Sequence, residues 1–417
     1  MKKRRNAPKR PEIEMTLQAK ALGARADSVC EGPVYVPGLL PGERARVSVT
    51  GDRGRVIERL SDAPERVAPF CPVAQRCGGC ALQHFEKSAY QAWKRNLVVE
   101  ALAREGLDVE IAPLVEAWGQ GRRRARLHAK RVGKRVIFGY GERAAHSVVD
   151  VEACPVAHPL ISENIAALRA LAEQITPDKT TLDFALTASD AGLDVGIEGL
   201  KAIGLNEREA AGDFAHRHNW ARVSLNGEVA VERARPTIAF GAAKTVPPAG
   251  SFLQATDAGE DYLTGRAMAA AKGAKAILDL YAGSGAFGLR LAQLAPVQGV
   301  EGEAGPLQAM RDSADHTPGL KPVTTLVRDL AREPLTINEL KDFDCVVIDP
   351  PRSGARAQCE NLAGSDCATI ISVSCNPATF ARDGAILLAG GYRMGPVTPV
   401  DQFAWTGHVE VIAEFSK

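Results

Sequence analysis

The sequence predicts an α/β protein in which a doubly wound parallel sheet follows a small β-barrel. After roughly Pro236, short apolar strands alternate with helical segments, which is typical of a parallel sheet covered on both faces. Residues 13–62 instead contain short alternating runs broken by proline and glycine, as in VPGLLPGERARV, and these predict a small OB-like barrel. Residues 63–235 show no clear periodicity, and we expect a mixed fold there.

The chain of 417 residues is long enough for two or three domains. We expect a basic tail at residues 1–12, the barrel at 13–62, the mixed central domain at 63–235 and the α/β domain at 236–417. The basic start MKKRRNAPKRPE is not followed by the apolar segment of a signal peptide, and we find no membrane-spanning run. We therefore expect a cytoplasmic protein without membrane contact, and we take a monomer as the default.

The turn AGSGAFG places Gly283, Gly285 and Gly288 in G-x-G-x-x-G spacing between a predicted strand and a helix. Glycines at this point let the backbone approach a nucleotide, so Gly283 and Gly285 are candidate cofactor contacts. Glu301, which ends the next predicted strand, can accept hydrogen bonds from the ribose hydroxyls of an adenosine. These features suit a dinucleotide-dependent dehydrogenase and a methyltransferase that uses S-adenosylmethionine equally well. Asp349 in VVIDPPR, at the end of a fourth strand, favours the methyltransferase, because hydride-transfer sites do not contain this motif.

Cys375 in SVSCNPATF is a candidate nucleophile. It ends an apolar strand and precedes Asn376 and Pro377, which predict a helix N-cap and a first helical residue. The positive end of the helix dipole predicts a thiol pKa below its ordinary value of about 8.5. We expect the other cysteines of this region to be buried packing residues; they are Cys345, Cys359 and Cys367.

A thiolate next to a methyl donor has a specific use in pyrimidine chemistry. Its addition to C6 of uracil makes C5 nucleophilic enough to attack a sulfonium methyl group. A base must then remove the C5 proton so that the thiolate can leave. Glu410 in GHVEV, between two apolar residues of the last predicted strand, is the candidate base.

Three closely spaced cysteines, Cys71, Cys77 and Cys80 in CPVAQRCGGC, predict a metal site with Cys154 in ACP as the fourth ligand. Four thiolates can bind zinc or an iron-sulfur cluster. A zinc ribbon usually has two C-x-x-C pairs, and only one is present here. Nine cysteines without a secretory signal favour such a site, or free thiols, over disulfides.

A basic run lies between the third and fourth of these cysteines. RRRARLHAKRVGKR, residues 122–135, has eight Lys or Arg in fourteen positions. Such a density predicts contact with nucleic-acid phosphates, although a solvated basic face is the simpler alternative. The candidate RNA-binding residues are Arg122, Arg123, Arg124 and Arg126.

Together these motifs resemble the bacterial RNA uracil-5-methyltransferases, in particular the iron-sulfur-containing 23S ribosomal RNA enzymes. The resemblance spans nearly the whole chain and is carried by VPGLLPGERARV, CPVAQRCGGC, RRRARL, ACPV, SFLQ, DLYAGSG, DPPR, SCNPAT and HVE. It implies an N-terminal TRAM barrel, a central iron-sulfur domain and a class I, Rossmann-like methyltransferase domain. The implied cofactors are S-adenosyl-L-methionine and a [4Fe-4S] cluster on the four cysteines.

The resemblance also assigns roles to single residues. It places the nucleophile at Cys375 and the base at Glu410. The implied cofactor-binding residues are Gln254, Tyr281, Glu301, Asp329 and Asp349. The sequence departs from the family pattern at Ala255, Ala282 and Ala286.

The expected partner is structured RNA, with 23S ribosomal RNA preferred over transfer RNA. Two alternatives remain open from the sequence. One is a transfer RNA uridine C5-methyltransferase, and the other is an RNA-binding protein whose transferase site has decayed, as the alanines at the departures would allow.

Overall fold

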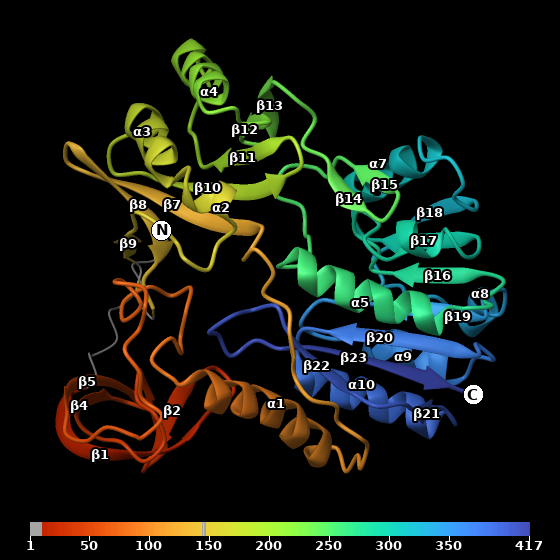
Figure 1. The fold of residues 1–417 in the computed structure, drawn as a ribbon, viewed down its shortest axis with the longest axis horizontal. Helices are drawn as coiled ribbons and strands as arrows, with labels where there is room; N and C mark the ends of the chain where they lie inside the picture. Colours follow the sequence, from red (N-terminus) through yellow and green to blue (C-terminus); the bar gives the residue numbers. More distant parts are fainter. Residues whose placement is uncertain (1–10, 144, 146) are drawn as a thin grey trace, which may run out of the picture. The chain divides into compact units, whose positions relative to one another are not determined.

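The structure is a computed structural model that describes residues 11–143, 145 and 147–417 (Figure 1). Most of the basic tail expected at residues 1–12 therefore lies outside the described residues. Packing divides the chain into two compact units. The first contains the chain up to Trp93 together with Trp405–His408, and the second contains Lys94–Ala404 and Val409–Lys417. None of the described helices is long and apolar enough to cross a membrane.

The first unit contains a closed barrel of five strands. These are β1 (Ile13–Leu22), β2 (Asp27–Cys30), β3 (Val34–Pro37), β4 (Arg44–Thr50) and β5 (Arg53–Arg59). They are hydrogen-bonded in the order β1-β2-β3-β5-β4. Buried residues such as Leu17, Val36 and Val47 fill its core, and exposed residues alternate with them along β4. The small N-terminal barrel predicted from the sequence is confirmed.

Helix α1 (Lys87–Arg104) follows a stretch without regular strands. Its first turn is capped by the Glu86 carboxylate, which accepts hydrogen bonds from the N–H groups of Ser88 at 2.9 Å and Ala89 at 3.0 Å. The helix begins in the first unit and ends in the second, where Val98 and Leu102 join a core cluster.

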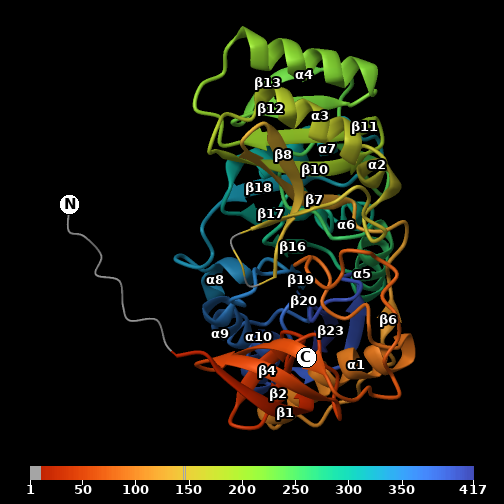
Figure 2. The same ribbon diagram turned by 90° about the vertical axis from the view of Figure 1, so that its left-hand side faces the viewer.

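A seven-stranded sheet forms one part of the second unit. Its strands are β7 (Arg124–Val132), β8 (Arg135–Gly141), β9 (Val148–Asp150), β10 (Thr181–Ser189), β11 (Gly192–Glu198), β12 (Arg222–Leu225) and β13 (Glu228–Glu232). Its helices are α2 (Pro159–Ser162), α3 (Ile165–Ile175) and α4 (Leu205–Arg217). The order is β13-β12-β11-β10-β7-β8-β9, and only β11 and β12 are parallel neighbours, with α4 in the crossover. Helices α3 and α4 pack against each other on the same side of the sheet (Figure 1 and Figure 2).

The other part of the second unit is a larger, mostly parallel sheet. Its strands are β16 (Ile277–Leu280), β17 (Val297–Glu301), β18 (Val323–Val327), β19 (Cys345–Ile348), β20 (Thr369–Ser374), β21 (Arg393–Met394), β22 (Thr398–Asp401), β23 (Glu410–Ser416) and the short β6 (Val115–Glu116). A separate hairpin is formed by β14 (Ile238–Phe240) and β15 (Ala243–Thr245). The order is β18-β17-β16-β19-β20-β23-β22-β6, and β23 runs antiparallel to β20 and β22. The predicted parallel sheet is therefore confirmed, with β23 as an antiparallel strand within it.

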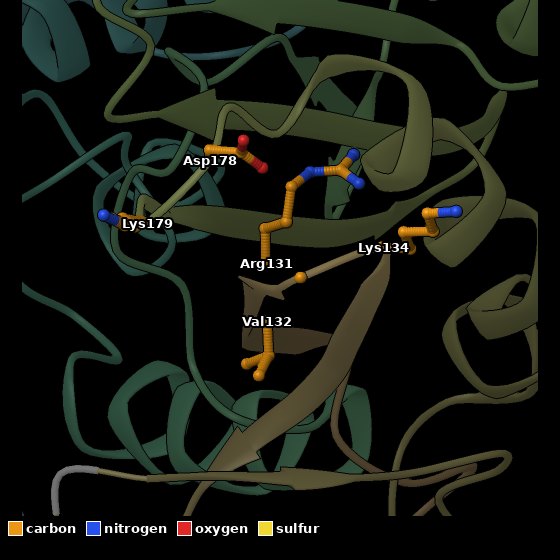
Figure 3. Close-up of a pocket in the computed structure, with 6 residues that line it drawn as sticks. Arg131, Val132, Lys134, Asp178 and Lys179 are labelled. Carbon is orange, nitrogen blue, oxygen red and sulfur yellow. The ribbon is translucent and has the colours of Figure 1, made fainter.

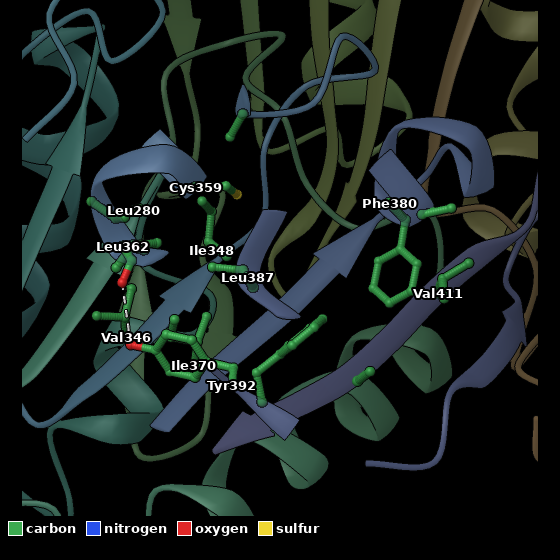
Figure 4. Packing of buried hydrophobic residues seen from close by; sticks show 14 of the residues in the cluster. Leu280, Val346, Ile348, Cys359, Leu362, Ile370, Phe380, Leu387, Tyr392 and Val411 are labelled. Atoms are coloured by element: carbon green, nitrogen blue, oxygen red, sulfur yellow. Dashed lines mark hydrogen bonds between the residues drawn. The ribbon is translucent and has the colours of Figure 1, made fainter. Parts of the chain in front are cut away.

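Helices cover both faces of this sheet. They are α5 (Asp257–Ala270), α6 (Gly288–Leu291), α7 (Ala304–Asp315), α8 (Ile337–Leu340), α9 (Arg356–Ala363) and α10 (Pro377–Ala389). Successive strand residues point to opposite faces, so two core clusters form. In the cluster of Figure 4, Val346 and Ile370 pack against Leu362, and the Tyr392 hydroxyl donates to the Leu362 carbonyl at 3.3 Å.

Helix α6 is shorter than the sequence predicts. AFGLRLAQLA reads as one continuous helix, but the α-helical part is Gly288–Leu291. The next N–H groups, of Gln293 and Leu294, bond to carbonyls three residues earlier, which tightens the chain into a turn. Pro296 follows and cannot donate a helical hydrogen bond.

Candidate active site

The predicted reactive residues meet at one edge of the large sheet. Parallel strands bring their carboxyl ends to the same edge, where α/β proteins bind ligands. Glu301 ends β17, Asp349 directly follows β19, and Cys375 directly follows β20. Glu410 is the first residue of β23, whose antiparallel direction brings its amino end to this edge. Topology alone therefore collects residues more than a hundred positions apart.

The pairing of β20 with β23 places the candidate nucleophile beside the candidate base. Ser374 is paired with Val411, so the next residues along the two strands are Cys375 and Glu410. On its other side Glu410 is paired with Val400 of β22. Glu410 is only 2% exposed, and its apolar neighbours Val409 and Val411 are buried as well.

The glycine turn after β16 has a backbone that requires glycine. Gly283 and Gly285 have φ angles of +53° and +93°, and a Cβ on Gly285 would lie 2.9 Å from the Leu289 side chain. Tyr281 also has a positive φ of +62°, a strained value for a bulky residue at a functional turn. The Glu301 carboxylate accepts a hydrogen bond from the Gly283 N–H at 3.1 Å. The glycine turn and Glu301 are therefore held together by a direct hydrogen bond.

Two further carboxylates belong to this half of the sheet, one in β16 and one after β18. Asp279, in β16, accepts the Gly288 N–H at 2.8 Å, and burial raises its pKa to about 8. Asp329, after β18, is exposed and accepts the Ala331 N–H at 3.1 Å. Asp329 is therefore open to a ligand, whereas Asp279 stabilises the start of α6.

The Cys375 thiol is not activated in the way the sequence predicts. Asn376 and Pro377 do begin α10 as expected, with the Asn376 side chain accepting the Ala378 N–H at 3.2 Å. Burial nevertheless raises the pKa of Cys375 to about 11, and the charges of Glu410 and Asp349 add to this shift. The predicted lowering of its pKa is wrong, because desolvation and two carboxylates outweigh the helix dipole and the nearby Arg352.

The two carboxylates nearest the thiol are joined by two glutamine side chains. Gln254 donates to Asp349 at 2.8 Å, and Gln402 donates to the Gln254 carbonyl oxygen at 2.7 Å and to Glu410 at 3.0 Å. Burial is the main cause that raises the pKa of both Asp349 and Glu410 above their ordinary range. Gln402 was not predicted. Its only sequence signal is a polar residue directly after β22 and eight positions before Glu410.

A buried ion pair lies next to this network. Lys94 of α1 pairs with Asp401 and donates to the Phe403 carbonyl at 3.0 Å. Both side chains of the pair are fully buried. Burial lowers the pKa of Lys94 to about 8, and the neighbouring Asp401 opposes that shift. Lys94 therefore fixes the carboxyl end of β22, which continues into Gln402.

Known proteins match most of this chain. A family model described as tRNA (Uracil-5-)-methyltransferase matches residues 311–415. An RNA methyltransferase of Rhizobium meliloti is 42% identical over 411 residues, which cover 96% of this chain and 99% of the relative. The 23S rRNA (uracil(1939)-C(5))-methyltransferase of Chromohalobacter salexigens is 35% identical over 408 residues, which cover 90% and 83%.

This chain belongs to the S-adenosylmethionine-dependent RNA (uracil-5-)-methyltransferase family. The solved structure of Pyrococcus abyssi tRNA (uracil-54, C5)-methyltransferase, in complex with S-adenosyl-L-homocysteine, shares its fold. The TM-score is 0.74 at 23% identity, and the match covers 96% of this chain and 100% of that one. The expected methyltransferase fold and RNA methyltransferase family are thereby confirmed.

In this methyltransferase, the Arg123 side chain is held inside the fold by other residues. Its side chain is buried, pairs with Glu260 of α5 and donates to the Gln254 carbonyl at 3.1 Å. Arg290 pairs with the other oxygen of Glu260 at 2.8 Å. A buried guanidinium held in this way is not presented at the surface.

The other candidate arginines differ in exposure. Arg122 donates to the Ala404 carbonyl at 3.3 Å, and Arg124 donates to the Leu253 carbonyl at 2.9 Å. The Arg124 guanidinium also lies 5.2 Å from the centre of the exposed Phe252 ring. The Arg126 side chain is 62% exposed and lies 3.7 Å from Asp183.

A basic pocket lies at the far end of β7. It has a volume of about 680 Å³ and is lined by Arg131, Val132, Gly133, Lys134, Asp178 and Lys179 (Figure 3). Arg131 donates to the Thr176 carbonyl at 2.5 Å and so belongs to the wall of the pocket. Since a strand rises about 3.3 Å per residue, the pocket is roughly 25 Å along β7 from Arg124.

The four cysteines of the predicted cluster lie in both units. Cys71, Cys77 and Cys80 are in the first unit, and Cys154 is in the second. Cys77 and Cys80 are buried, and the Cys77 sulfur accepts the Gly79 N–H at 3.4 Å. Among the residues that the structure describes, no three His, Cys, Asp or Glu side chains are grouped to hold a metal ion. A metal site at these cysteines stays a prediction.

We expect Lys94→Met to destabilise the second unit strongly. It would leave the Asp401 carboxylate buried without its cation, and breaking such a pair costs about 3–5 kcal/mol. Arg104→Met, on the same helix, removes an exposed partner of Glu100 and should change stability little. Urea unfolding followed by circular dichroism compares the two variants, and equal midpoints would contradict the importance of the buried pair.

Proposed function

We propose that this protein methylates C5 of a uridine in 23S ribosomal RNA, with Cys375 as nucleophile and Glu410 as base. The observation that carries this proposal is the β20–β23 ladder, in which the thiol and a buried carboxylate follow a paired position at the same edge of the sheet as the glycine turn. Glu301 and the backbone of Gly283 and Gly285 would hold S-adenosylmethionine, which supplies the methyl group. Their arrangement suits a nucleoside, because the positive φ angles of both glycines disfavour side chains at the turn.

The chain's own residues perform the remaining steps. The Cys375 thiolate adds to C6 of the uracil, and the electron pair of the C5–C6 bond moves to C5 and the C4 carbonyl. After C5 has taken the methyl group, Glu410 accepts the C5 proton. The electrons of that C–H bond reform the C5–C6 bond, and the sulfur of Cys375 leaves as a thiolate. The target base must leave its stack to reach these groups.

Two substitutions should separate the steps. Cys375→Ala removes the nucleophile, so both methyl transfer and any covalent protein–RNA adduct should be lost. Glu410→Gln should keep the addition and slow the release by about 10² to 10⁴, which makes a methylated adduct accumulate. Labelled methyl transfer and denaturing gels measure both outcomes. Full activity of Cys375→Ala would refute the assigned nucleophile.

The choice of ribosomal RNA is supported by the relative from Chromohalobacter salexigens, whose name specifies 23S rRNA. We expect deletion of the gene to remove a 5-methyluridine from 23S rRNA, because the enzyme proposed to make it would be absent. Mass spectrometry of ribosomal and transfer RNA from the deletion strain and its parent gives the answer. Loss from transfer RNA alone would assign the other substrate.

For RNA binding we propose the exposed part of the basic strand. Arg126 lies on β7, and the pocket lysines, Lys134 and Lys179, lie in turns beside the far end of that strand. A row of cations along such a strand suits a phosphate backbone, which carries a charge at every nucleotide. Arg124 and the exposed Phe252 would contact the RNA closest to the reacting base.

We further propose that Cys71, Cys77, Cys80 and Cys154 bind a [4Fe-4S] cluster. The support is the chemistry of four thiols in the spacing of the resembled family, with an N–H group directed at the Cys77 sulfur. The cluster would stabilise the segment that precedes the basic run.

Anaerobic purification should therefore yield a brown protein with about four irons and four sulfides per chain. Cys77→Ala should lose this iron because it removes a thiolate ligand. Cys30→Ala, which changes a buried cysteine of the barrel, should retain it. Colourless wild-type protein with one zinc would contradict the cluster.

A further inference from the structure

The amide of Gln402 lies at the centre of a branched hydrogen-bond chain. Its Oε1 accepts the backbone N–H of Ala255 at 2.9 Å. Its Nε2 donates to Oε1 of Gln254 at 2.7 Å and to Oε2 of Glu410 at 3.0 Å. Nε2 of Gln254 then donates to Oδ2 of Asp349 at 2.8 Å.

The direction of every bond in this chain is determined by one backbone group. The N–H of Ala255 can only donate, so the oxygen of the Gln402 amide must face it. The NH₂ of Gln402 must then face Gln254 and Glu410. Because the oxygen of Gln254 receives one of these hydrogens, its own NH₂ is turned to Asp349. An amide flip at any point would bring two donors or two acceptors together.

Gln402 is also held tightly in place. It is 1% exposed, and Gln254 and Glu410 are each 2% exposed. A Cβ added to Gly259 of α5 would lie 2.8 Å from both Cβ and Oε1 of Gln402, so the helix backbone closes one side of the side chain. Losing one donor in such a dry site leaves the partner acceptor without water to replace it.

We infer that Gln402 is a positioning residue for the second half of the reaction. It holds one oxygen of Glu410 and leaves the other directed to the substrate, and it sets the amide orientation of Gln254. Among the described residues, no other group donates a hydrogen bond to Glu410. This inference rests on the proposed function, because it assigns Gln402 to the step in which Glu410 removes the C5 proton.

The charges around Glu410 predict how proton removal by this carboxylate should depend on pH. Burial and the carboxylate of Asp349 raise the pKa of Glu410, whereas the Gln402 hydrogen bond and Lys94 lower it. Cys375 also faces Glu410, and Asp401 is paired with Lys94. Removing the Gln402 donor should therefore raise the pKa of Glu410 further, so proton removal should need a higher pH.

The test uses Gln402→Met, which keeps the length of the side chain and removes its donors. We expect the covalent adduct to form normally and its decay to slow by about tenfold to a hundredfold, the range for a hydrogen bond to a charged group. Decay of the preformed adduct after a pH jump does not require ionisation of the Cys375 thiol, so its pH midpoint depends on Glu410. In the variant we expect this midpoint to move to higher pH. Gln402→Glu keeps the acceptor for Ala255 and should shift decay in the same direction.

Gln358→Met is the matched control. Gln358 of α9 is also 1% exposed and is bonded to both backbone groups of Leu335, away from the site. It should lose stability while leaving the rate and pH midpoint of decay unchanged. Decay of the Gln402→Met and Gln402→Glu adducts at the wild-type rate and midpoint would overturn the inference.

RNA containing 5-fluorouridine separates this inference from the proposed function. Fluorine at C5 cannot leave as a proton, so the adduct is trapped whatever the state of Glu410. Wild type, Gln402→Met and Gln358→Met should all trap it equally if Gln402 acts only after addition. Reduced trapping by Gln402→Met would overturn its assignment to the second half-reaction. No trapping by wild type would instead refute the proposed nucleophilic mechanism.

Discussion

The site depends on one constraint of topology, which is that β23 runs antiparallel between β20 and β22. A central strand is buried on both faces, and so its first residue, Glu410, is desolvated while it still lies at the ligand edge. The register is equally important. A slip of one residue would turn every side chain of β23 to the other face and place a valine opposite Cys375.

Burial of two carboxylates at this edge is compensated mainly by neutral donors. Asp349 and Glu410 receive amide hydrogens from Gln254 and Gln402, and the closest buried cation, Lys94, is already paired with Asp401. Neutral donors stabilise a carboxylate less than a direct ion pair does, which leaves its affinity for protons high. A general base is most effective when its pKa lies near the working pH, and an amide network is suited to that.

The sequence predicts features that depend on neighbouring residues. The glycine turn, the Asn376 cap of α10 and the burial of Cys359 each follow from a few adjacent positions, and the structure has all of them. Gln402 could not be found this way, because it bonds to Gln254, 148 residues away. The prediction of a lowered pKa for Cys375 is wrong for the same reason, because the two carboxylates that help to raise this pKa, Glu410 and Asp349, come from other strands.

The central sheet shows a related limit of sequence reading. Polar and apolar residues alternate along β7 from Arg124 to Lys130, with the apolar Leu127 and Ala129 buried, but one such strand does not predict the fold of residues 63–235. The number of cations in this region is evident from the sequence, but the groups that they contact are not. Arg123, for instance, forms a buried ion pair with Glu260.

The acidic partners along β7 also change what the basic run means for association. Arg126 lies near Asp183, and Arg135 pairs with Asp150 at 2.6 Å, in addition to the buried Arg123. Cations already neutralised by the protein condense fewer anions from solution and displace fewer counterions from a nucleic acid. The basic run of residues 122–135 would therefore gain less entropy from ion release than eight free cations would. If the basic run is the RNA-binding surface, as proposed, its affinity should depend more on shape and less on ionic strength than its composition implies.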